Sequence, residues 1–198
     1  MTDRIAQVIV IAEDGRSAQF LRRYVQRAVS YREIRVQIAP KGQQSAYDWV
    51  IAQYPKEVAE QRHRVSPKSK NIAALAVHVD ADTNEVEQRM RQLADALQAA
   101  HGQSRQRSER IAIAIPKRNI ETWLHGLCDI EVDETYDFKR DVQHRIATNQ
   151  RQRDRLCNQR IGPAVNELYR LTRKNAPSPP GNMPSVATTV TELRRLET

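Results

Sequence analysis

Residues 75–82 (LAVHVDAD) restrict the possible folds of this chain most, because they join a buried-strand pattern to two carboxylates. The segment is apolar, partly β-branched and free of turn residues until it reaches Asp80 and Asp82. Such a pattern is typical of a buried strand. Side chains two positions apart on an extended segment point the same way, so the two aspartates can converge. Two like charges at close range repel unless a cation or a proton lies between them.

Three further apolar segments predict strands on either side of this one in the chain. They lie at about 8–12, 34–38 and 111–115, and helical patterns separate the strands at about 17–28, 45–61 and 86–102. Ser17 is the expected N-cap of the first helix, and Asn119 that of a short helix ending near Leu127. Strands that alternate with helices form parallel sheets with helices on both faces. We therefore predict the α/β class, with a Rossmann-like parallel sheet of about four strands.

The last third of the chain carries no strand pattern. Residues 161–171 are modestly amphipathic, the proline-rich segment 177–184 must be a loop, and Ser185 is the expected cap of a final helix. We divide the chain into an α/β domain over residues 1–135 and a helical C-terminal extension over residues 136–198. The extension is expected to pack on the same domain.

The charge of the chain bears on its partners and its location. The formal net charge is +8 and the pI is about 9.8, which favours a polyanion such as nucleic acid as a partner. Solvated arginine-rich helices can also carry such a charge without binding anything. Cys128 and Cys157 form no CxxC pair, and we expect thiols rather than a disulfide. The absence of a signal-peptide pattern and of an apolar run near 20 residues predicts a cytoplasmic protein with no membrane partner; an oligomer is compatible with the sequence.

Acidic residues follow three of the four predicted strands. Glu13 follows the first strand, Asp80 and Asp82 follow the third, and Glu121 follows the fourth. Ligands of open parallel sheets gather outside the carboxyl ends of the strands, so these four carboxylates are expected at one edge. Oxygen ligands suit hard divalent cations, and we predict that the four bind Mg²⁺ or Mn²⁺.

Two basic residues stand beside Glu121 in the sequence. Lys117 and Arg118 could neutralise a scissile phosphate, while bound metal ions activate a water and stabilise the leaving oxygen. The predicted catalytic residues are therefore Glu13, Asp80, Asp82, Lys117 and Arg118.

Each of these residues also has a purely structural interpretation. Glu13 and Glu121 could favour helix N-termini through the helix dipole, and aspartates are common in turns after strands. Lys117 and Arg118 could be ordinary solvated charges. The shared position of the four carboxylates favours a site over four separate coincidences. We interpret His78 as a buried histidine with satisfied hydrogen bonds and leave it outside the site.

Three motifs together resemble the Toprim family, whose fold is shared by topoisomerases, primases and a set of nucleases. Residues 11–15 (IAEDG) match its glutamate after the first strand, and residues 79–82 (VDAD) its Asp-x-Asp after the third. Residues 115–124 (IPKRNIETWL) are similar to a P-x-R-x-x-E-x-W-L stretch of small stand-alone Toprim proteins related to the overcoming-lysogenization-defect nucleases. Pro184-Ser-Val186 is similar to a late Pro-Ser-Leu in such proteins. The resemblance covers about residues 5–127.

The resemblance implies a metal-dependent endonuclease. It implies that Glu13 is a metal ligand or general acid/base, and that Asp80, Asp82 and Glu121 are metal ligands. Family members are often encoded with an ATPase that controls them and act in defence against phage, so a separate ATPase partner is implied as well. The chain differs from the family at Asp14, which separates Glu13 from Gly15, and at Thr83-Asn84 after the aspartates.

Two other function classes fit part of the pattern. A catalytically silent Toprim-like protein could use the same fold to bind nucleic acid or to act as an adaptor. A phospho-receiver domain would place its accepting aspartate at Asp80, but it needs a Ser or Thr after the fourth strand, where this chain has Pro116-Lys117. The motifs of P-loop NTPases (GxxxxGK[ST]) and of HExxH metalloproteases are absent.

Overall fold

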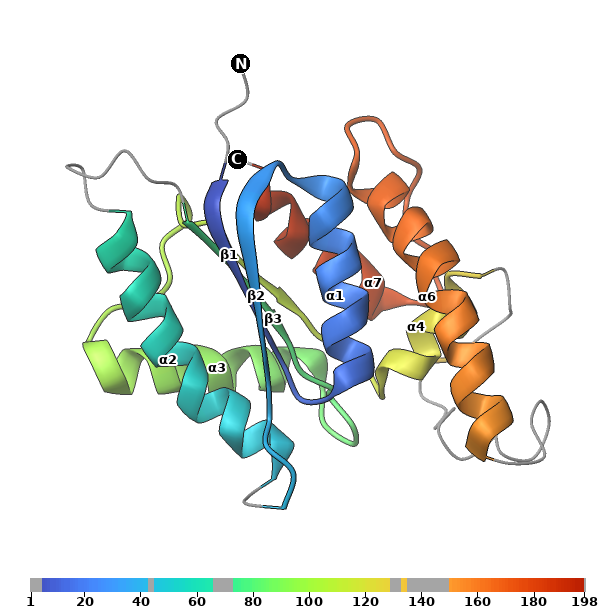
Figure 1. The fold of residues 1–198 in the computed structure, drawn as a ribbon, viewed down its shortest axis with the longest axis horizontal. Helices are drawn as coiled ribbons and strands as arrows, with labels where there is room; N and C mark the ends of the chain where they lie inside the picture. The colour runs from blue at the N-terminus through green and yellow to red at the C-terminus, as the bar shows by residue number, and fades with distance from the viewer. Residues whose placement is uncertain (1–4, 43–44, 66–72, 129–132, 135–149, 198) are drawn as a thin grey trace.

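The fold is built around one parallel sheet, as the strand pattern predicts (Figure 1). A computed structural model describes residues 5–42, 45–65, 73–128, 133–134 and 150–197. The strand order is β2-β1-β3-β4, and all three pairings are parallel. The strands are β1 (Ile5–Ala12), β2 (Tyr31–Ile38), β3 (Ala73–His78) and β4 (Ile111–Ala114). The prediction of an α/β fold with a four-stranded parallel sheet is confirmed.

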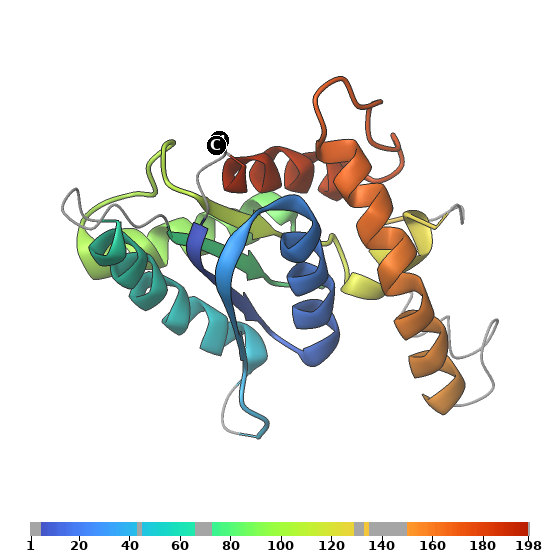
Figure 2. The ribbon, with the colours of Figure 1, turned by 45° about the horizontal axis from the view of Figure 1, so that its top comes forward.

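Helices cover both faces of the sheet (Figures 1 and 2). One face packs against α2 (Ala46–Arg64) and α3 (Val86–His101). The other face packs against α1 (Gly15–Ala28), α4 (Ile120–Gly126), α6 (Gln150–Thr172), α7 (Pro184–Leu193) and the short 3-10 helix η1 (Arg194–Leu196).

Alternation along the strands divides the core into two layers. On the α2 and α3 side, β1 and β3 contribute β-branched and leucine side chains. On the other side β3 and β4 contribute alanines, namely Ala74, Ala76, Ala112 and Ala114, which leave room for helices to approach closely. The indole of Trp123 is fully buried in this second layer. Apolar burial of this kind is the main force that holds the two layers together.

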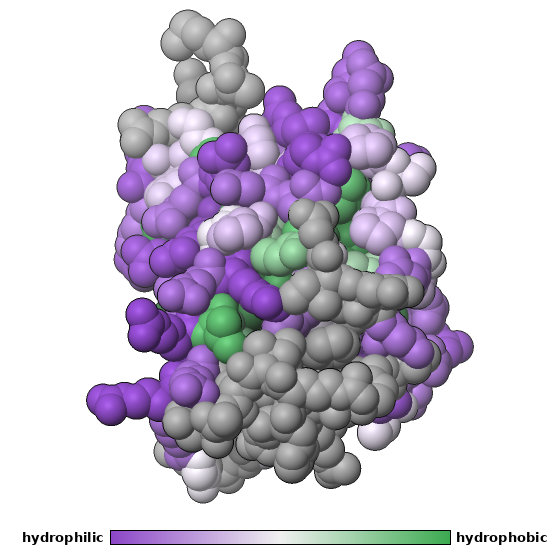
Figure 3. Space-filling view, turned by 90° about the vertical axis from the view of Figure 1, so that its right-hand side faces the viewer, coloured by the Kyte–Doolittle hydropathy of each residue, from purple (hydrophilic) through white to green (hydrophobic). Residues whose placement is uncertain are grey.

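The C-terminal helices complete the second core layer. Cys157 and Leu168 of α6 and Val186 and Leu193 of α7 are buried in the same cluster as the sheet residues. The predicted boundary at residues 135/136 lies outside the described residues. The outer surface over the α4 and α6 side is mostly hydrophilic, with small apolar patches between polar side chains (Figure 3).

Two of the predicted helix caps are wrong. Asp14, rather than Ser17, caps α1, and its carboxylate accepts hydrogen bonds from the backbone N–H groups of Arg16 (2.7 Å) and Ser17 (2.9 Å). Ser185 lies inside α7, whose N-cap position is Met183. Asn119 caps α4 as predicted, through a 3.3 Å bond from the N–H of Thr122. Searched over the described part of the chain, no helix is long and apolar enough to cross a membrane.

Candidate active site at the carboxyl ends of the strands

The order of the strands places a topological switch point between β1 and β3. The chain leaves β1 toward β2 on one side and later returns to β3 on the other side. In open α/β sheets, ligands bind at the carboxyl ends of the strands where the winding direction reverses. Glu13 follows β1 directly, and Asp80 follows β3 by two residues. Two of the predicted site residues therefore flank the switch point of this sheet.

The Glu13 side chain and the Asp80 backbone are in direct contact at this switch point. The Glu13 carboxylate accepts a 3.0 Å hydrogen bond from the backbone N–H of Asp80, whose side chain is buried. The pKa of Glu13 is raised from 4.5 to about 7, with burial as the largest cause; the hydrogen bond from the Asp80 N–H opposes this rise, and the negative charge of Asp82 adds to it. The carboxyl group of Glu13 is thus close enough to Asp82 for the two charges to interact.

Of the three acidic residues Glu13, Asp80 and Asp82, Asp82 is the exposed one. Its backbone has φ = 55°, in the left-handed region that aspartate tolerates better than most residues. Its side chain is 58% exposed, and its carboxylate lies 3.8 Å from a guanidinium nitrogen of Arg89. Residues in rare backbone conformations concentrate at functional sites, and here the conformation belongs to a predicted site residue.

Arg89 of α3 places a buried positive charge beside the carboxylates. Its guanidinium lies over the ring of Tyr47, 3.6 Å from the centroid, and donates a 3.2 Å bond to the side chain of Gln92. Its charge lowers the pKa of Glu13. No pattern in the sequence marks Arg89, because an arginine in an amphipathic helix is ordinary on its own.

Lys117 and Arg118 lie beside the aspartate loop, so the structure brings these two predicted residues to the site. The backbone N–H of Asp82 bonds to the carbonyl of Arg118 at 3.1 Å, and the Arg118 guanidinium donates to the carbonyl of Asp82 at 3.0 Å. The ammonium of Lys117 donates to the carbonyl of Asn84 at 3.2 Å and forms an ion pair with Glu85. Both cations are thereby held next to residues 82–85.

Glu121 has a different environment from the other predicted ligands. Its carboxylate is only 2% exposed and forms an ion pair with Arg16 of α1. Arg16 also donates to Asp154 of α6 at 2.7 Å. In the described ranges, no three His, Cys, Asp or Glu side chains are grouped closely enough to hold a metal ion. A metal-binding role for the four carboxylates stays a prediction.

A pocket of about 380 Å³ lies next to Lys117 and contains an acid that the sequence analysis missed. Its lining includes Lys117, Glu134 and Ser185. The buried Glu134 accepts a 3.0 Å bond from the backbone N–H of Ser185 and a bond from its hydroxyl, which itself accepts a 2.8 Å bond from the indole of Trp123. Burial raises the pKa of Glu134. No local motif marks this residue in the sequence.

His78 is buried, as predicted, but it is not satisfied. Neither ring nitrogen has a hydrogen-bond partner among the described residues. Its ring meets that of Trp123 edge-on, with centroids 6.2 Å apart. Burial lowers the pKa of His78 from 6.5 to about 4, so the imidazole is neutral at physiological pH.

Comparison of the chain with models of known families, with curated proteins and with solved structures found no match. The fold is therefore established as a generic α/β fold with a four-stranded parallel sheet. Any assignment of function must come from the residues of the site.

Proposed function

We propose that this protein is a metal-dependent nuclease of the Toprim type, which cleaves phosphodiester bonds in nucleic acid. The observation that carries the proposal is the contact between Glu13 and Asp80 at the switch point, with Asp82 close by. Carboxylates at the ends of two adjacent central strands form the kind of oxygen-rich edge that hard cations prefer.

The donor set suits Mg²⁺ or Mn²⁺ chemically. Magnesium usually takes one or two protein carboxylates and keeps several waters, so a large cluster of ligands is not required. Glu13 and Asp80 are held by the fold, whereas the exposed Asp82 can turn toward a ligand. When bound, such a cation would activate a water and stabilise the leaving oxygen.

The protein's cations would position the substrate. Lys117 and Arg118 lie beside the aspartate loop, where their positive charges can attract a phosphate. The pocket beside Lys117 offers space for part of the substrate. The net charge of +8 would support binding of a polyanion through counterion release. A separate ATPase that controls the activity, and a role in defence against phage, belong to the same proposal.

A catalytically silent nucleic-acid-binding or adaptor protein is the second candidate. The specific support for this candidate is that arginine side chains of the protein already lie beside carboxylates whose charge a metal ion would otherwise neutralise. Glu121 is already paired with Arg16, and Asp82 lies near Arg89. Such pairs can hold a Toprim-like edge together without any bound cation.

The two candidates are separated by nicking of supercoiled plasmid DNA, with RNA and transfer RNA as further substrates, in the presence of Mg²⁺ or Mn²⁺. Wild-type protein is compared with Asp80→Asn and with the matched control Asp95→Asn, which alters an exposed carboxylate on α3. We expect metal-dependent cleavage that Asp80→Asn reduces at least about 100-fold and that Asp95→Asn leaves unchanged, given losses of 10–100-fold for residues merely next to metal ligands.

Equal cleavage by the wild type and Asp80→Asn would remove the nuclease proposal. Nucleic-acid binding that survives Asp80→Asn, together with no cleavage under any metal, would establish the silent candidate instead.

A further inference from the structure

Helices α1 and α6 run side by side on one face of the sheet, and an open groove lies between them at the surface (Figures 1 and 2). The volume of this α1/α6 groove is about 480 Å³. The described residues that line it are Arg23, Gln26 and Arg27 of α1 and Gly162, Val165 and Asn166 of α6. They include two arginines and two side-chain amides but no carboxylate, so the groove is basic.

Both arginines of the groove extend from α1 toward α6. A side-chain carbon at Gly162 would lie 3.9 Å from Nη1 of Arg23, so this guanidinium lies beside the backbone of α6. The guanidinium of Arg27 lies over the ring of Tyr169, 5.0 Å from its centroid, and that of Arg173 lies 5.1 Å from the same centroid. Residues four apart on a helix lie on the same side. Arg23 and Arg27 therefore bring two neighbouring positive charges to the groove.

These two charges are not compensated within the described part of the chain. Neither Arg23 nor Arg27 forms an ion pair with a described carboxylate, and the cation–π contact of Arg27 leaves its charge in place. Arg16, about two turns earlier on the same side of α1, differs from them. It forms an ion pair with Glu121 and donates a 2.7 Å bond to Asp154 of α6. The contact between α1 and α6 thus neutralises Arg16 and leaves the two later arginines as cations.

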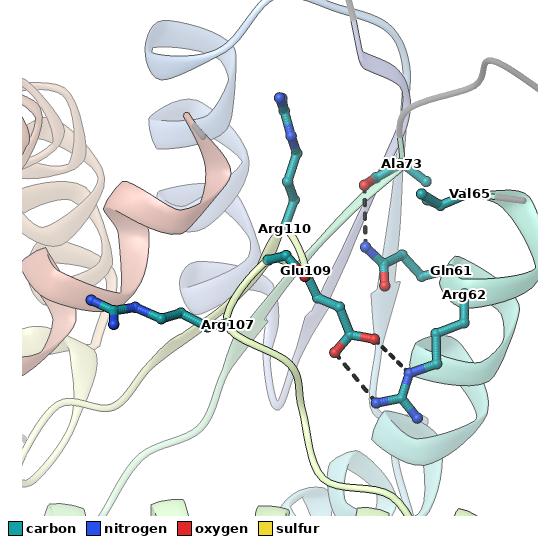
Figure 4. Close-up of a pocket in the computed structure, with 8 residues that line it drawn as sticks. Gln61, Arg62, Val65, Ala73, Arg107, Glu109 and Arg110 are labelled. Atoms are coloured by element: carbon teal, nitrogen blue, oxygen red, sulfur yellow. Dashed lines mark hydrogen bonds and ion pairs between the residues drawn. The ribbon is translucent and has the colours of Figure 1, made fainter. Parts of the chain in front are cut away.

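A pocket of about 650 Å³ beside the amino ends of β3 and β4 provides a contrast (Figure 4). Its Arg62 forms a two-pronged ion pair with Glu109, at 2.6 Å and 3.3 Å. A guanidinium held in this way has little to gain from an added phosphate. Arg23 and Arg27 keep that capacity, because arginine binds phosphate through two parallel N–H donors.

The other groups in the groove indicate which part of a nucleic acid fits there. Gln26 and Asn166 are exposed amides that can donate hydrogen bonds to phosphate and sugar oxygens. The described lining residues include no aromatic ring, and the nearby Tyr169 already contacts two guanidinium groups. Binding of unpaired bases by stacking needs an accessible aromatic face. The groove therefore suits the backbone of a nucleic acid rather than its bases.

We propose that the α1/α6 groove binds the phosphate backbone of a nucleic acid, with Arg23 and Arg27 contacting neighbouring phosphates. This inference rests on the proposed function in taking nucleic acid as the substrate, and it names the surface that holds this substrate away from the carboxylate edge. α1 begins at Gly15, shortly after Glu13, and a rise of about 1.5 Å per residue places Arg23 about 12 Å farther along the helix. A backbone that follows α1 therefore leads from the groove to the carboxylates.

Fluorescence anisotropy with short labelled DNA and RNA duplexes, over a series of salt concentrations, tests the proposal. All proteins carry Asp80→Asn and are measured in EDTA, so that cleavage does not change the probe. Each phosphate contact adds about 0.9 to the slope of log affinity against log salt, which at about 0.1 M salt is about tenfold in affinity. We expect Arg23→Ala and Arg27→Ala each to weaken binding by about this factor and to make the slope shallower, with at least one of the two duplexes.

Arg22→Ala is the matched control, because Arg22 is also exposed on α1 but does not line the groove. It removes the same charge and should leave affinity and slope nearly unchanged. Equal losses in all three variants would show a diffuse effect of net charge and would overturn the proposal, as would unchanged binding in Arg23→Ala and Arg27→Ala. Should Arg27→Ala disturb the packing of Tyr169, Arg23→Ala still decides the question.

The same measurements separate the groove from the nuclease activity and from a membrane. Groove-dependent binding by a protein that cleaves no substrate with any metal would support the α1/α6 groove and remove the nuclease proposal. Metal-dependent cleavage, together with normal binding by the Arg23 and Arg27 variants, would do the reverse. Binding to phosphatidylserine vesicles that both variants weaken, with no binding of either duplex, would assign the groove to a lipid surface and overturn the proposal.

Discussion

The two ends of the sheet hold different sets of charged groups, although the same two strands supply both. At the carboxyl ends, β3 leads to Asp80 and β4 leads to Lys117; at the amino ends, β3 begins at Ala73 and β4 follows Arg110. The first end combines carboxylates with Lys117, Arg118 and Arg89, whereas arginines outnumber carboxylates at the second.

The two ends also differ in how charge is compensated. At the amino end, Arg62 and Glu109 neutralise each other through two direct hydrogen bonds. At the carboxyl end, Glu13 has a backbone N–H as its partner, and Arg89 comes no closer to Asp82 than 3.8 Å. Weakly compensated carboxylates can gain from an added cation, whereas a closed ion pair cannot. The difference favours cation binding at the carboxyl end and a structural role for the closed ion pair at the amino end.

The largest expected effect distinguishes a catalytic role of Glu13 from the helix-capping role of its neighbour Asp14. Glu13→Gln should reduce metal-dependent cleavage at least about 100-fold, the scale of losing one preorganised electrostatic contact in an active site. Asp14→Asn should retain activity, because asparagine can cap α1 as aspartate does. Plasmid nicking rates measure both. Similar losses in the two variants would mean that Glu13 acts only at the start of the helix.

At the amino end, the largest effect should be on stability. Glu109→Gln leaves the partly buried guanidinium of Arg62 without its carboxylate and should lower the free energy of unfolding by about 1–3 kcal/mol. The control is Glu60→Gln, which breaks an exposed pair with Arg64 one helical turn away and should cost about 0.5 kcal/mol or less. Urea denaturation measures both values. An equal cost for both variants would contradict a special role for the Arg62–Glu109 pair.

Acidification should destabilise the fold through His125 of α4, which contacts Arg160 of α6. Burial and the nearby charge of Arg160 lower the pKa of His125 from 6.5 to about 4. The folded state therefore favours the neutral ring, so this stabilisation is complete above pH 6.5 and is lost as the pH falls toward 4. The melting temperature should decline over this window, and His125→Gln should make the decline shallower. An unchanged pH profile in the variant would assign the acid sensitivity elsewhere.

The smallest effect concerns the charge of Arg89. Arg89→Met keeps an apolar side chain against Tyr47 but removes a positive charge near Asp82. A charge pair at about 4 Å contributes about 1 kcal/mol in water, so affinity for Mn²⁺ should rise about fivefold. Calorimetric titration with Mn²⁺ measures the change. Unaltered or weaker binding would show that Arg89 does not compete with a cation for the carboxylates.

Local sequence patterns predicted the sheet and the position of three carboxylates, those of Glu13, Asp80 and Asp82. Apolar runs and turn residues mark β1 and β3, and chain topology then places Glu13 next to Asp80. The same kind of pattern predicted the capping of α4 by Asn119. It failed at Ser17 because two acceptors, Asp14 and Ser17, stand within one turn of each other, and the geometry of the turn decides between them.

Long-range charge pairing could not be predicted from the sequence. Arg16 meets Glu121 across 105 positions of the chain and Asp154 across 138. Such pairs depend on which helix faces meet in space. The same limit applies to Glu134, whose partner Ser185 is brought to it by the packing of α7.

The arrangement of α7 and η1 has a consequence for synthesis on the ribosome. These last helical segments cover the alanine-rich face of β3 and β4, and Leu193 and Leu196 are fully buried there. Until residues 184–196 have been synthesised, that face lacks part of its cover, and apolar surface exposed during folding promotes aggregation. Final closure of the core must therefore wait until residues 184–196 have left the ribosome.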